Sequence, residues 1–444
     1  MAFVHRDSCE CLKTELDLFS VPPTQTSIEH GQWVEYHPVA QFSDGGPIEF
    51  HIAGSGSEYL DLSETQIYVK AKVTHHDGTN LVADDQVGPV NLLLQSLFSQ
   101  VDVSLNDRVI TPSTPTYPYR AMIESLLQYG SDCKSTQLTS ALFYKDTAGS
   151  MEQANPLATG EDANHGLKKR HRYIKGSNSF EMMGPLHCDL FFQAKHLLNG
   201  VDLRVKIIRT KEDFCLMSPN PQASFKVVLQ DCSLFVRKVK VSPSVMLGHA
   251  RALEKGTAKY PVRRVMCKVL SVPQGELTLQ QDHLFLGQIP QRIIIGCVDN
   301  KAFSGSYAYN PFNFQNFDVD YVSLYVDGTQ VPFKPLTPSY TVTTGSSSIR
   351  AYHTLFSGTD KMFKDVGNDI TREEYEQGYA LYAFDLSPDL SSGQHFNLKK
   401  QGNLRLEMHF KKVLVQGVNI VVYAEFDNIL EIDRARNILF DYSV

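Results

Sequence analysis

Pairs of cysteines and histidines are the first candidates for chemistry in this sequence. Cys9 and Cys11 form a C-x-C pair, but a metal site needs about four ligands, and no partner ligands lie near this pair. His75 and His76 come directly before an Asp-Gly dipeptide, which is typical of a hairpin turn. We therefore interpret the first pair as plain terminal thiols and the second as part of an exposed turn.

The other histidines and carboxylates form no recognisable catalytic set. His187 and His196 flank a predicted strand at a spacing that matches no metal signature. The chain has no Walker loop, G-x-S-x-G elbow, H-E-x-x-H or C-x-x-C, and it lacks the H-x-H context of a cupin-type oxygenase. The sequence therefore predicts no catalytic residue, no metal site and no cofactor, and hence a protein that is not an enzyme. Two acidic pairs, too small for the six or more oxygens that Ca²⁺ takes, are interpreted as solvated: Asp84/Asp85 and Asp318/Asp320.

A long polar insertion at residues 145–179 contains a run of basic residues, Lys168–Arg172. Such a run could act as a nuclear import signal or an anion patch, but the net charge of −7 favours a solvated loop face. A second unusual run is aromatic and lacks the interleaved Lys or Arg of a base-stacking platform. We expect it to be a loop packed under a sandwich or at a subunit contact. Its members are Tyr307, Tyr309, Phe312, Phe314 and Phe317.

The composition excludes several classes of protein. With 444 residues the chain is long enough for two or three domains, and 42% hydrophobic residues suffice for large cores. The negative net charge argues against tight direct binding of nucleic acid, which favours basic proteins. Eight scattered cysteines, no N-x-[ST] sequon and no signal peptide predict a reducing compartment, buried free thiols and no secretion. No apolar run reaches the ~20 residues that span a bilayer.

The sequence contains a similar β-rich pattern twice. Residues 101–107 alternate in polarity and run into a Pro/Thr-rich stretch and a helical pattern, and residues 319–328 do the same. Residues 203–207 and 404–408 form a second matching pair. The two copies lie roughly 200 residues apart, which is the size of a domain rather than of a solenoid repeat. Two similar all-β domains indicate a building block more than an enzyme.

Period-two alternation predicts most of the remaining elements as half-buried antiparallel strands. Two helical patterns interrupt them, one at 119–129 behind Pro118 and one at 349–356 behind the serines 346–348. A third helix, at 244–255, is interpreted as the connector between two β-sandwiches. The predicted strands are 67–73, 203–207, 225–229, 265–269, 292–298, 319–326, 404–410 and 418–426.

These patterns give a predicted division of the chain into five parts. Residues 1–34 are an N-terminal arm in which Leu12, Leu16 and Phe19 are spaced for a short amphipathic turn. Residues 35–241 form the first sandwich domain and 242–256 the connector. Residues 257–430 form the second sandwich domain, and 431–444 are a C-terminal tail.

Most of the chain, from about residue 35 to 430, resembles the hexon-type major capsid proteins of Polinton/Maverick elements and their adintovirus relatives. The matching stretches are Tyr-Leu-Asp-Leu-Ser at 59–63 leading into 67–73, Val-Asn-Leu-Leu-Leu-Gln-Ser-Leu-Phe at 90–98, Thr-Tyr-Pro-Tyr-Arg at 116–120 through 127, Gly-Pro-Leu-His-Cys-Asp-Leu at 184–190 and Tyr-Ala-Tyr-Asn-Pro-Phe at 307–312 with the strand after it.

This resemblance implies an all-β tandem double jelly roll, with two eight-stranded antiparallel sandwiches and short helices in the loops. It further implies a homotrimer that forms a pseudo-hexagonal capsomer, and capsomers that tile an icosahedral virion shell. A single-jelly-roll penton protein is the implied second partner, and the N-terminal arm would lie at the capsomer base. The resemblance makes no prediction about an internal membrane.

Two other functions stay open at this point. The first is a jelly-roll sugar-binding protein or metal-dependent enzyme, which a pocket with convergent histidines and carboxylates would favour. The second is a capsid-derived protein that a host has domesticated and that no longer forms particles. Fold and trimerisation would be the same in this last case.

Overall fold

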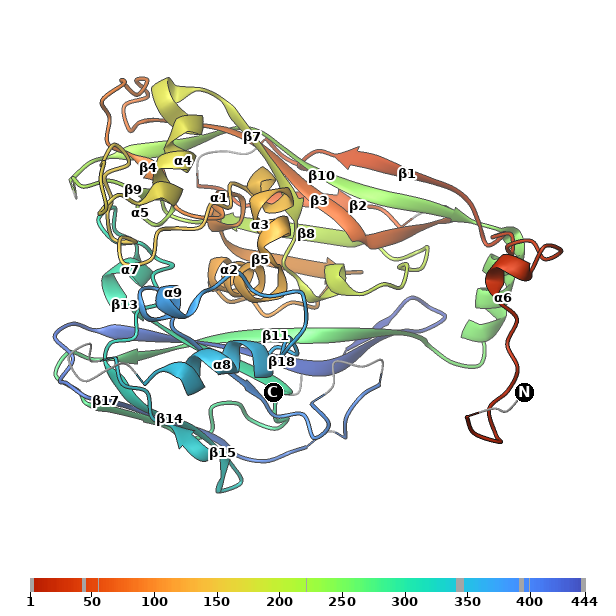
Figure 1. Cartoon of the computed structure of the whole chain (residues 1–444). Coiled ribbons are helices and arrows are strands. Elements are labelled where there is room, and N and C mark those ends of the chain that lie inside the picture. Colours follow the sequence, from red (N-terminus) through yellow and green to blue (C-terminus); the bar gives the residue numbers. More distant parts are fainter. Residues whose placement is uncertain are drawn as a thin grey trace.

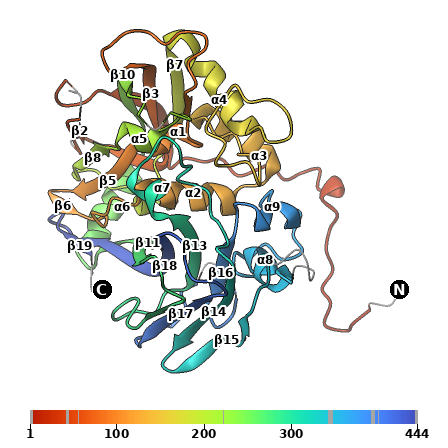
Figure 2. The same cartoon turned by 90° about the vertical axis from the view of Figure 1, so that its left-hand side faces the viewer.

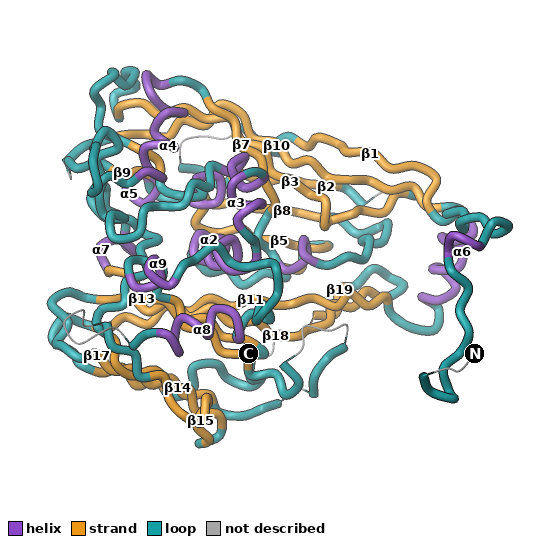
Figure 3. Tube along the Cα trace, in the orientation of Figure 1, coloured by secondary structure: helices purple, strands orange, loops and turns teal. Residues whose placement is uncertain are grey.

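The computed structural model describes residues 4–41, 45–54, 56–220, 222–340, 347–390, 395–398 and 400–440. Across these residues the chain forms two β-rich units that lie one above the other in Figure 1. Helix α6 (Pro243–Leu253) joins them at one end, and the N-terminal segment lies at that same end. Figure 3 shows that strands make up the body of both units.

The first unit consists of two facing four-stranded sheets and a small ribbon. One sheet has the spatial order β1 (Ile28–Tyr36), β10 (Phe225–Val241), β3 (Glu58–His75), β7 (Phe180–Pro185). The other has the order β2 (Ile48–Ile52), β8 (Leu203–Arg209), β5 (Phe98–Leu105), β6 (Arg108–Val109). The ribbon pairs β4 (Gly88–Pro89) with β9 (Leu216–Met217).

The second unit also consists of two antiparallel sheets. One has the order β11 (Ala258–Val272), β18 (Val418–Ile432), β13 (Arg292–Asp299), β16 (Leu381–Asp385), and a short strand β19 (Ile438–Phe440) also pairs with β18. The other has the order β12 (Thr278–Gln281), β17 (Leu404–Phe410), β14 (Val319–Val326), β15 (Thr329–Leu336).

Both units have the same topology. When the ribbon and β19 are set aside, each unit places its first, eighth, third and sixth strands in one sheet and its second, seventh, fourth and fifth in the other. Eight antiparallel strands in two facing sheets with this order form a jelly roll. The duplication predicted from the sequence is therefore confirmed at the level of every main strand.

Alternating side chains build the core of each jelly roll. In β17, Leu404, Leu406, Met408 and Phe410 are buried while the residues between them are half-exposed. This pattern is expected for a strand with one face on the core. Nearly all buried apolar residues of both units belong to one continuous cluster, so the two jelly rolls share a packed contact.

The predicted helices are present. The pattern at 119–129 corresponds to α2 (Tyr117–Gln128) with Pro118 in its first turn, and the connector corresponds to α6. The pattern at 349–356 corresponds to α8 (Ile349–Ser357), although Ser348 makes no capping bond there and its hydroxyl instead donates to Glu376. Of the proposed cap, Ser346 lies outside the described residues. The other helices are α1 (Leu93–Ser96), α3 (Ser131–Ser135), α4 (His165–Ile174), α5 (Glu212–Cys215), α7 (Asn300–Ser304) and α9 (Arg372–Glu376).

The interpretation of Lys168–Arg172 as a solvated loop face is wrong for Arg170 and His171, although Lys169 and Arg172 are exposed. These residues lie in α4, which Asn164 caps through its side chain. Arg170 is fully buried: its Nε donates to the Pro89 carbonyl at 2.8 Å, and its Nη2 lies 2.6 Å from Oδ1 of Asp146. The next residue of the run, His171, is buried as well. Two of the five residues of the basic run therefore hold α4 onto the first jelly roll.

The predicted domain limits stay predictions. At two of them, the limits at 34/35 and 430/431, strands extend into or lie within the predicted terminal segments. Strand β1 begins at Ile28, before the predicted start of the first domain at Glu35, and β19 lies inside the predicted tail at 431–444. No helix in the described ranges is both long and apolar enough to span a bilayer.

Candidate functional site at the contact between the two jelly rolls

Helix α2 lies between the two units, as Figure 2 shows. Eleven of its twelve residues are buried, because α2 packs on β5 of the first unit and on β18 of the second. A helix that is buried on all sides must satisfy the polar groups of its charged residues within the protein. The partners of those residues therefore show how the two units are joined.

Arg120 of α2 is the centre of a buried network of charges. Its Nε donates to Oε1 of Glu124, one helical turn later, at 3.0 Å. Its Nη1 lies 2.8 Å from Oδ1 of Asp189. His187 Nδ1 lies 2.6 Å from the second oxygen of Glu124. All four side chains are at most 9% exposed, so water contributes little to balancing these charges.

The second unit completes this network. The hydroxyl of Tyr423 in β18 lies 3.2 Å from Oε1 of Glu124, and the backbone N–H of Val265 in β11 donates to Oδ1 of Asp189 at 3.1 Å. The carboxylates of Glu124 and Asp189 thus each accept a hydrogen bond from a donor of the second unit. Because an unpaired buried charge is strongly unfavourable, separation of the two units would leave these groups poorly balanced.

Burial and pairing act in opposite directions on the two carboxylates. At Glu124 burial raises the pKa, but the Arg120 guanidinium and the bond to His187 outweigh it, so the pKa lies below its usual value. At Asp189 burial raises the pKa more than Arg120 and the Val265 N–H lower it. Oδ2 of Asp189 has no hydrogen-bond partner, which explains why this carboxylate is the less well stabilised of the two.

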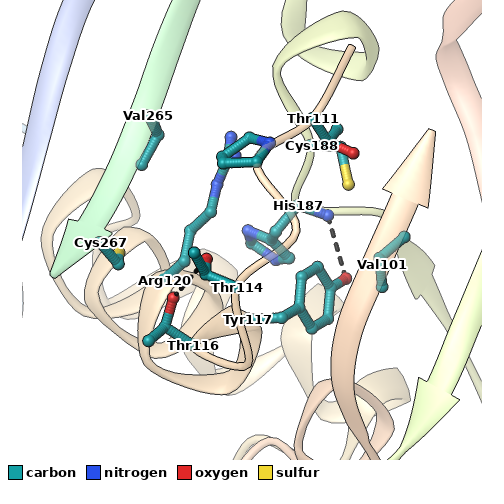
Figure 4. Close-up of a pocket in the computed structure, with 11 residues that line it drawn as sticks. Val101, Thr111, Thr114, Thr116, Tyr117, Arg120, His187, Cys188, Val265 and Cys267 are labelled. Atoms are coloured by element: carbon teal, nitrogen blue, oxygen red, sulfur yellow. Dashed lines mark hydrogen bonds between the residues drawn. The ribbon is translucent and has the colours of Figure 1, made fainter. Parts of the chain in front are cut away.

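A small cavity of about 30 Å³ lies beside Arg120 and His187 of this network. Figure 4 shows the residues that line it. Arg120, Tyr117 and His187 line it, and the His187 backbone N–H donates to the Tyr117 hydroxyl at 3.1 Å. A space of this size holds about one water molecule and no organic substrate. Cys188 and Cys267 also line it, and burial raises the pKa of each thiol to about 12. Neither cysteine is therefore a thiolate nucleophile at neutral pH.

An aromatic cluster forms a second contact between the units. The ring of Tyr119 in α2 stacks on Phe303 of α7 with centroids 5.3 Å apart. Phe312 meets both Tyr119 and Phe214 of α5 edge-on, at 5.8 and 6.0 Å. Such pairs are worth about 0.5–1.5 kcal/mol beyond the area they bury. The aromatic run predicted to pack under a sandwich thus places Phe312 in the contact between the jelly rolls.

Three lysines join the units on a further side. Lys134 donates to the carbonyls of Leu126 and Asn368, and Lys361 donates to the carbonyl of Gln128 at 2.7 Å. Lys145 Nζ lies 2.7 Å from Oε2 of Glu374. Except for the bond to Leu126, which lies within the first unit, these contacts link the first unit to the segment 361–374 of the second. Burial lowers the pKa of Lys134 to about 7.

The residues considered first in the sequence do not come together. Cys9 and Cys11 are exposed, which fits terminal thiols. The general expectation of buried thiols is wrong for these two and for the half-buried Cys133, and all eight cysteines are free. His75 lies 3.1 Å from Asp85, and Asp318 lies 2.7 Å from Lys412. Among the described residues no group of three or more His, Cys, Asp or Glu is arranged to hold a metal ion. The cysteines that are buried are Cys188, Cys215, Cys232, Cys267 and Cys297.

Sequence reasoning missed the charged network. Arg120 and Glu124 stand four residues apart on a helix whose other residues are largely apolar. An i,i+4 pair of opposite charges on such a helix is a signal of a buried ion pair. Nothing in the sequence indicates that Asp189 and Tyr423 are its partners, because the fold brings them together from distant segments, the turn at 189–192 and β18.

Two larger hollows lie elsewhere on the surface. One, of about 450 Å³, is lined mainly by carboxylates and carboxamides, among them Glu152 and Asn313. The other, of about 580 Å³, contains Arg209 and Lys226 together with Glu212 and Asp213. In neither do the described residues form a nucleophile–base pair of the kind that catalysis needs.

Comparisons with known proteins give one relative by sequence. The chain is 25% identical over 435 residues to the uncharacterized protein F54H12.2 of Caenorhabditis elegans, a match that covers 95% of this chain and 99% of that protein. No family model matches the chain.

Several solved structures are similar to this one. A chain of the Sputnik virophage has a TM-score of 0.65 at 12% identity, with 100% of this chain and 95% of that chain covered. The major capsid protein of Faustovirus has a TM-score of 0.57 at 9% identity, covering 94% and 92%. The mavirus major capsid protein has a TM-score of 0.52 at 13% identity, covering 99% and 97%. With two jelly rolls of the same strand order joined in tandem, the chain has the double jelly-roll fold.

Proposed function

We propose that this chain is a major capsid protein whose three copies form a pseudo-hexagonal capsomer. The observation that carries the proposal is the presence of two jelly rolls of identical topology in one chain, because three such chains present six similar sides. The likeness over nearly the whole chain to major capsid proteins of Faustovirus and mavirus supports it.

The further parts of this proposal concern assembly and origin. Capsomers tile an icosahedral virion shell, with a single-jelly-roll penton protein as the second partner, and the protein is made in a reducing host compartment. The likeness to mavirus supports an origin in the Polinton/Maverick group. The net charge of −7 supports a shell that encloses nucleic acid without tight direct contact.

The buried network around Arg120 fits a structural role. It joins the two jelly rolls through buried contacts, and an assembling subunit needs a fixed angle between its two jelly rolls if the six sides of the capsomer are to be reproducible. The lining of the contact supports no chemistry, since its cavity of about 30 Å³ accommodates one water. We accordingly propose that the protein is not an enzyme.

Electron microscopy of recombinant protein in negative stain tests this proposal. We expect particles with a hexagonal outline, some of them in closed shells. Fields of small particles without hexagonal outline would overturn the capsomer, and the sugar-binding or enzymatic alternatives would then have to be tested.

A second candidate is a domesticated capsid-derived protein that trimerises but no longer forms shells. The relative in Caenorhabditis elegans favours it, because that protein belongs to an animal rather than to a virus. Hexagonal trimers that never close into shells, under any salt or pH used, would support this second candidate over the first.

A further inference from the structure

The two jelly rolls carry equivalent helices that differ in how they are covered. Helix α2 falls between β6 and β7, and α8 falls between β15 and β16, so both lie between the fifth and sixth strands of their unit. Eleven of twelve residues are buried in α2, whereas in α8 only Ala351 and Leu355 are buried. The second unit therefore exposes a helix face that its counterpart in the first unit keeps covered.

The equivalent sheets of the two units also differ in how they are covered: the sheet that contains β18 is covered in the second unit, and the sheet that contains β10 is not in the first. Every residue from Val418 to Phe426 of β18 is buried, because α2 and the turn at Asp189–Phe192 cover the outer face of β18 and β11. The equivalent strand of the first unit, β10, alternates between buried and more exposed residues along most of its length. Such alternation is typical of a sheet with one face on the core and one face uncovered. The first unit thus exposes a sheet face that its counterpart in the second unit keeps covered.

The exposed surface around α8 combines polar and apolar residues: the helix itself exposes Ile349 beside Arg350, His353 and Ser357, and the segments next to it add exposed aromatic side chains. Ile349 is 46% exposed, and Phe363, whose ring centroid lies 6.4 Å from that of His353, is 94% exposed. Arg350 donates to the carbonyls of Lys334 and Pro335, which places the neighbouring Phe333, 96% exposed, beside the start of α8. Exposed patches of this kind mark interaction surfaces. The α8 patch consists of Phe333, Ile349, His353, Met362, Phe363 and Val366.

The exposed sheet face also carries aromatic residues. Tyr68 and Phe235 alternate with the buried Ile67 and Leu234, so they point away from the core. Their rings meet edge-on with centroids 6.4 Å apart. Trp33 on the edge strand β1 is 56% exposed. The outer sheet face is defined here by Trp33, Glu35, Tyr68 and Phe235.

We propose that the α8 patch of one chain packs on the outer sheet face of a second copy, and so repeats between chains the contact that α2 makes within the chain. The occupant is a second copy because the chain already contains one example of this contact between equivalent elements. The inference rests on the proposed capsomer and names its subunit interface.

The arrangement accounts for closure of a ring. The contact is heterologous, since the helix side and the sheet side are different surfaces, and a heterologous contact closes only when its rotation divides a full circle. Within a chain, the first unit places its helix on the second unit. Between chains, the second unit of one chain would place its helix α8 on the first unit of the neighbouring chain. Six equivalent positions are then filled by three chains.

Site-specific photo-cross-linking of the full chain tests the interface. p-Benzoylphenylalanine replaces Phe363 or, separately, Phe333, and it replaces Val415 as a control that is 81% exposed in another loop of the second unit. After irradiation, mass spectrometry identifies the joined peptides. We expect the first two positions to yield cross-links between chains to peptides that contain Trp33, Tyr68 or Phe235, and the control to yield none of these.

Substitution gives a second readout. Phe363→Asp combined with Ile349→Asp should weaken trimer formation at least about tenfold, since exposed aromatic anchors dominate interface energies. Val415→Asp should leave it unchanged, and circular dichroism should show that all variants are folded. A trimer that survives the double substitution, or that is cross-linked through other surfaces, would overturn the interface and leave the capsomer intact. A wild-type chain that stays monomeric would overturn both.

Discussion

Replacement of Arg120 by Met tests whether the buried network holds the two jelly rolls together. The substitution keeps an unbranched side chain, shorter than that of Arg, and removes the positive charge between Glu124 and Asp189, whose side chains are 2% and 6% exposed. Breaking a buried ion pair by removal of one partner costs about 3–5 kcal/mol, because the other charge is left buried. We expect a loss in this range, near its upper end because two carboxylates lose their partner.

The assay is denaturation in urea, followed by circular dichroism and by fluorescence of Trp33, the single tryptophan of the chain. Trp33 reports on the first unit, so separation of its transition from the overall signal would show that the units have become uncoupled. The control is Arg204→Met, since Arg204 pairs with Asp107 at the surface, where both side chains are at least half exposed. An exposed pair is worth about 0–1 kcal/mol. A loss at Arg120 no larger than that at Arg204 would refute the reasoning.

Three further predictions concern the same contact and the thiols. Burial lowers the pKa of Lys134 to about 7, so between about pH 7 and 10 the unfolded chain binds more protons at this residue than the folded chain does. Urea titrations should therefore show the free energy of unfolding of the wild type rising relative to that of Lys134→Met, by up to about 1.4 kcal/mol per pH unit. A difference between the two proteins that stays constant with pH would contradict the lowered pKa. Phe312→Ala, which removes a buried ring from the cluster around Tyr119, should destabilise the protein by about 3–5 kcal/mol in the same titrations, and a loss below about 1 kcal/mol would show that the cluster is loosely packed. Under native conditions iodoacetamide should label Cys9 and Cys11 within minutes, as read by peptide mass spectrometry, and modification of the buried thiols at a similar rate would show that the jelly rolls open readily. The buried thiols in question are Cys188, Cys215, Cys232, Cys267 and Cys297.

Local patterns in the sequence predicted much of the fold. Pro118 followed by an apolar face indicated α2, alternation at 404–410 indicated β17, and the strand predicted at 418–426 corresponds to β18. The repeated strand, turn and helix pattern indicated two similar domains, which the identical strand orders confirm. These signals succeed because each arises within a stretch of about ten residues, where periodicity reports which face is buried.

Contacts between distant segments were beyond such reasoning. Arg170 was interpreted as solvated because the net charge of the chain is negative, yet the carbonyl of Pro89 and the carboxylate of Asp146 reach it only after the strands around α4 have assembled. The joining of Arg120 to Asp189 and of Glu124 to Tyr423 likewise depends on how the two jelly rolls pack. A single sequence carries no record of these pairings.

The mass of the assembled protein in solution tests the central claim most directly. Light scattering of the full chain behind size exclusion, over a range of concentrations, measures it without reference to shape. We predict a stable species of three times the chain mass of 49.9 kDa. A single species at 49.9 kDa at every concentration would contradict the claim that this double jelly roll is a capsomer subunit.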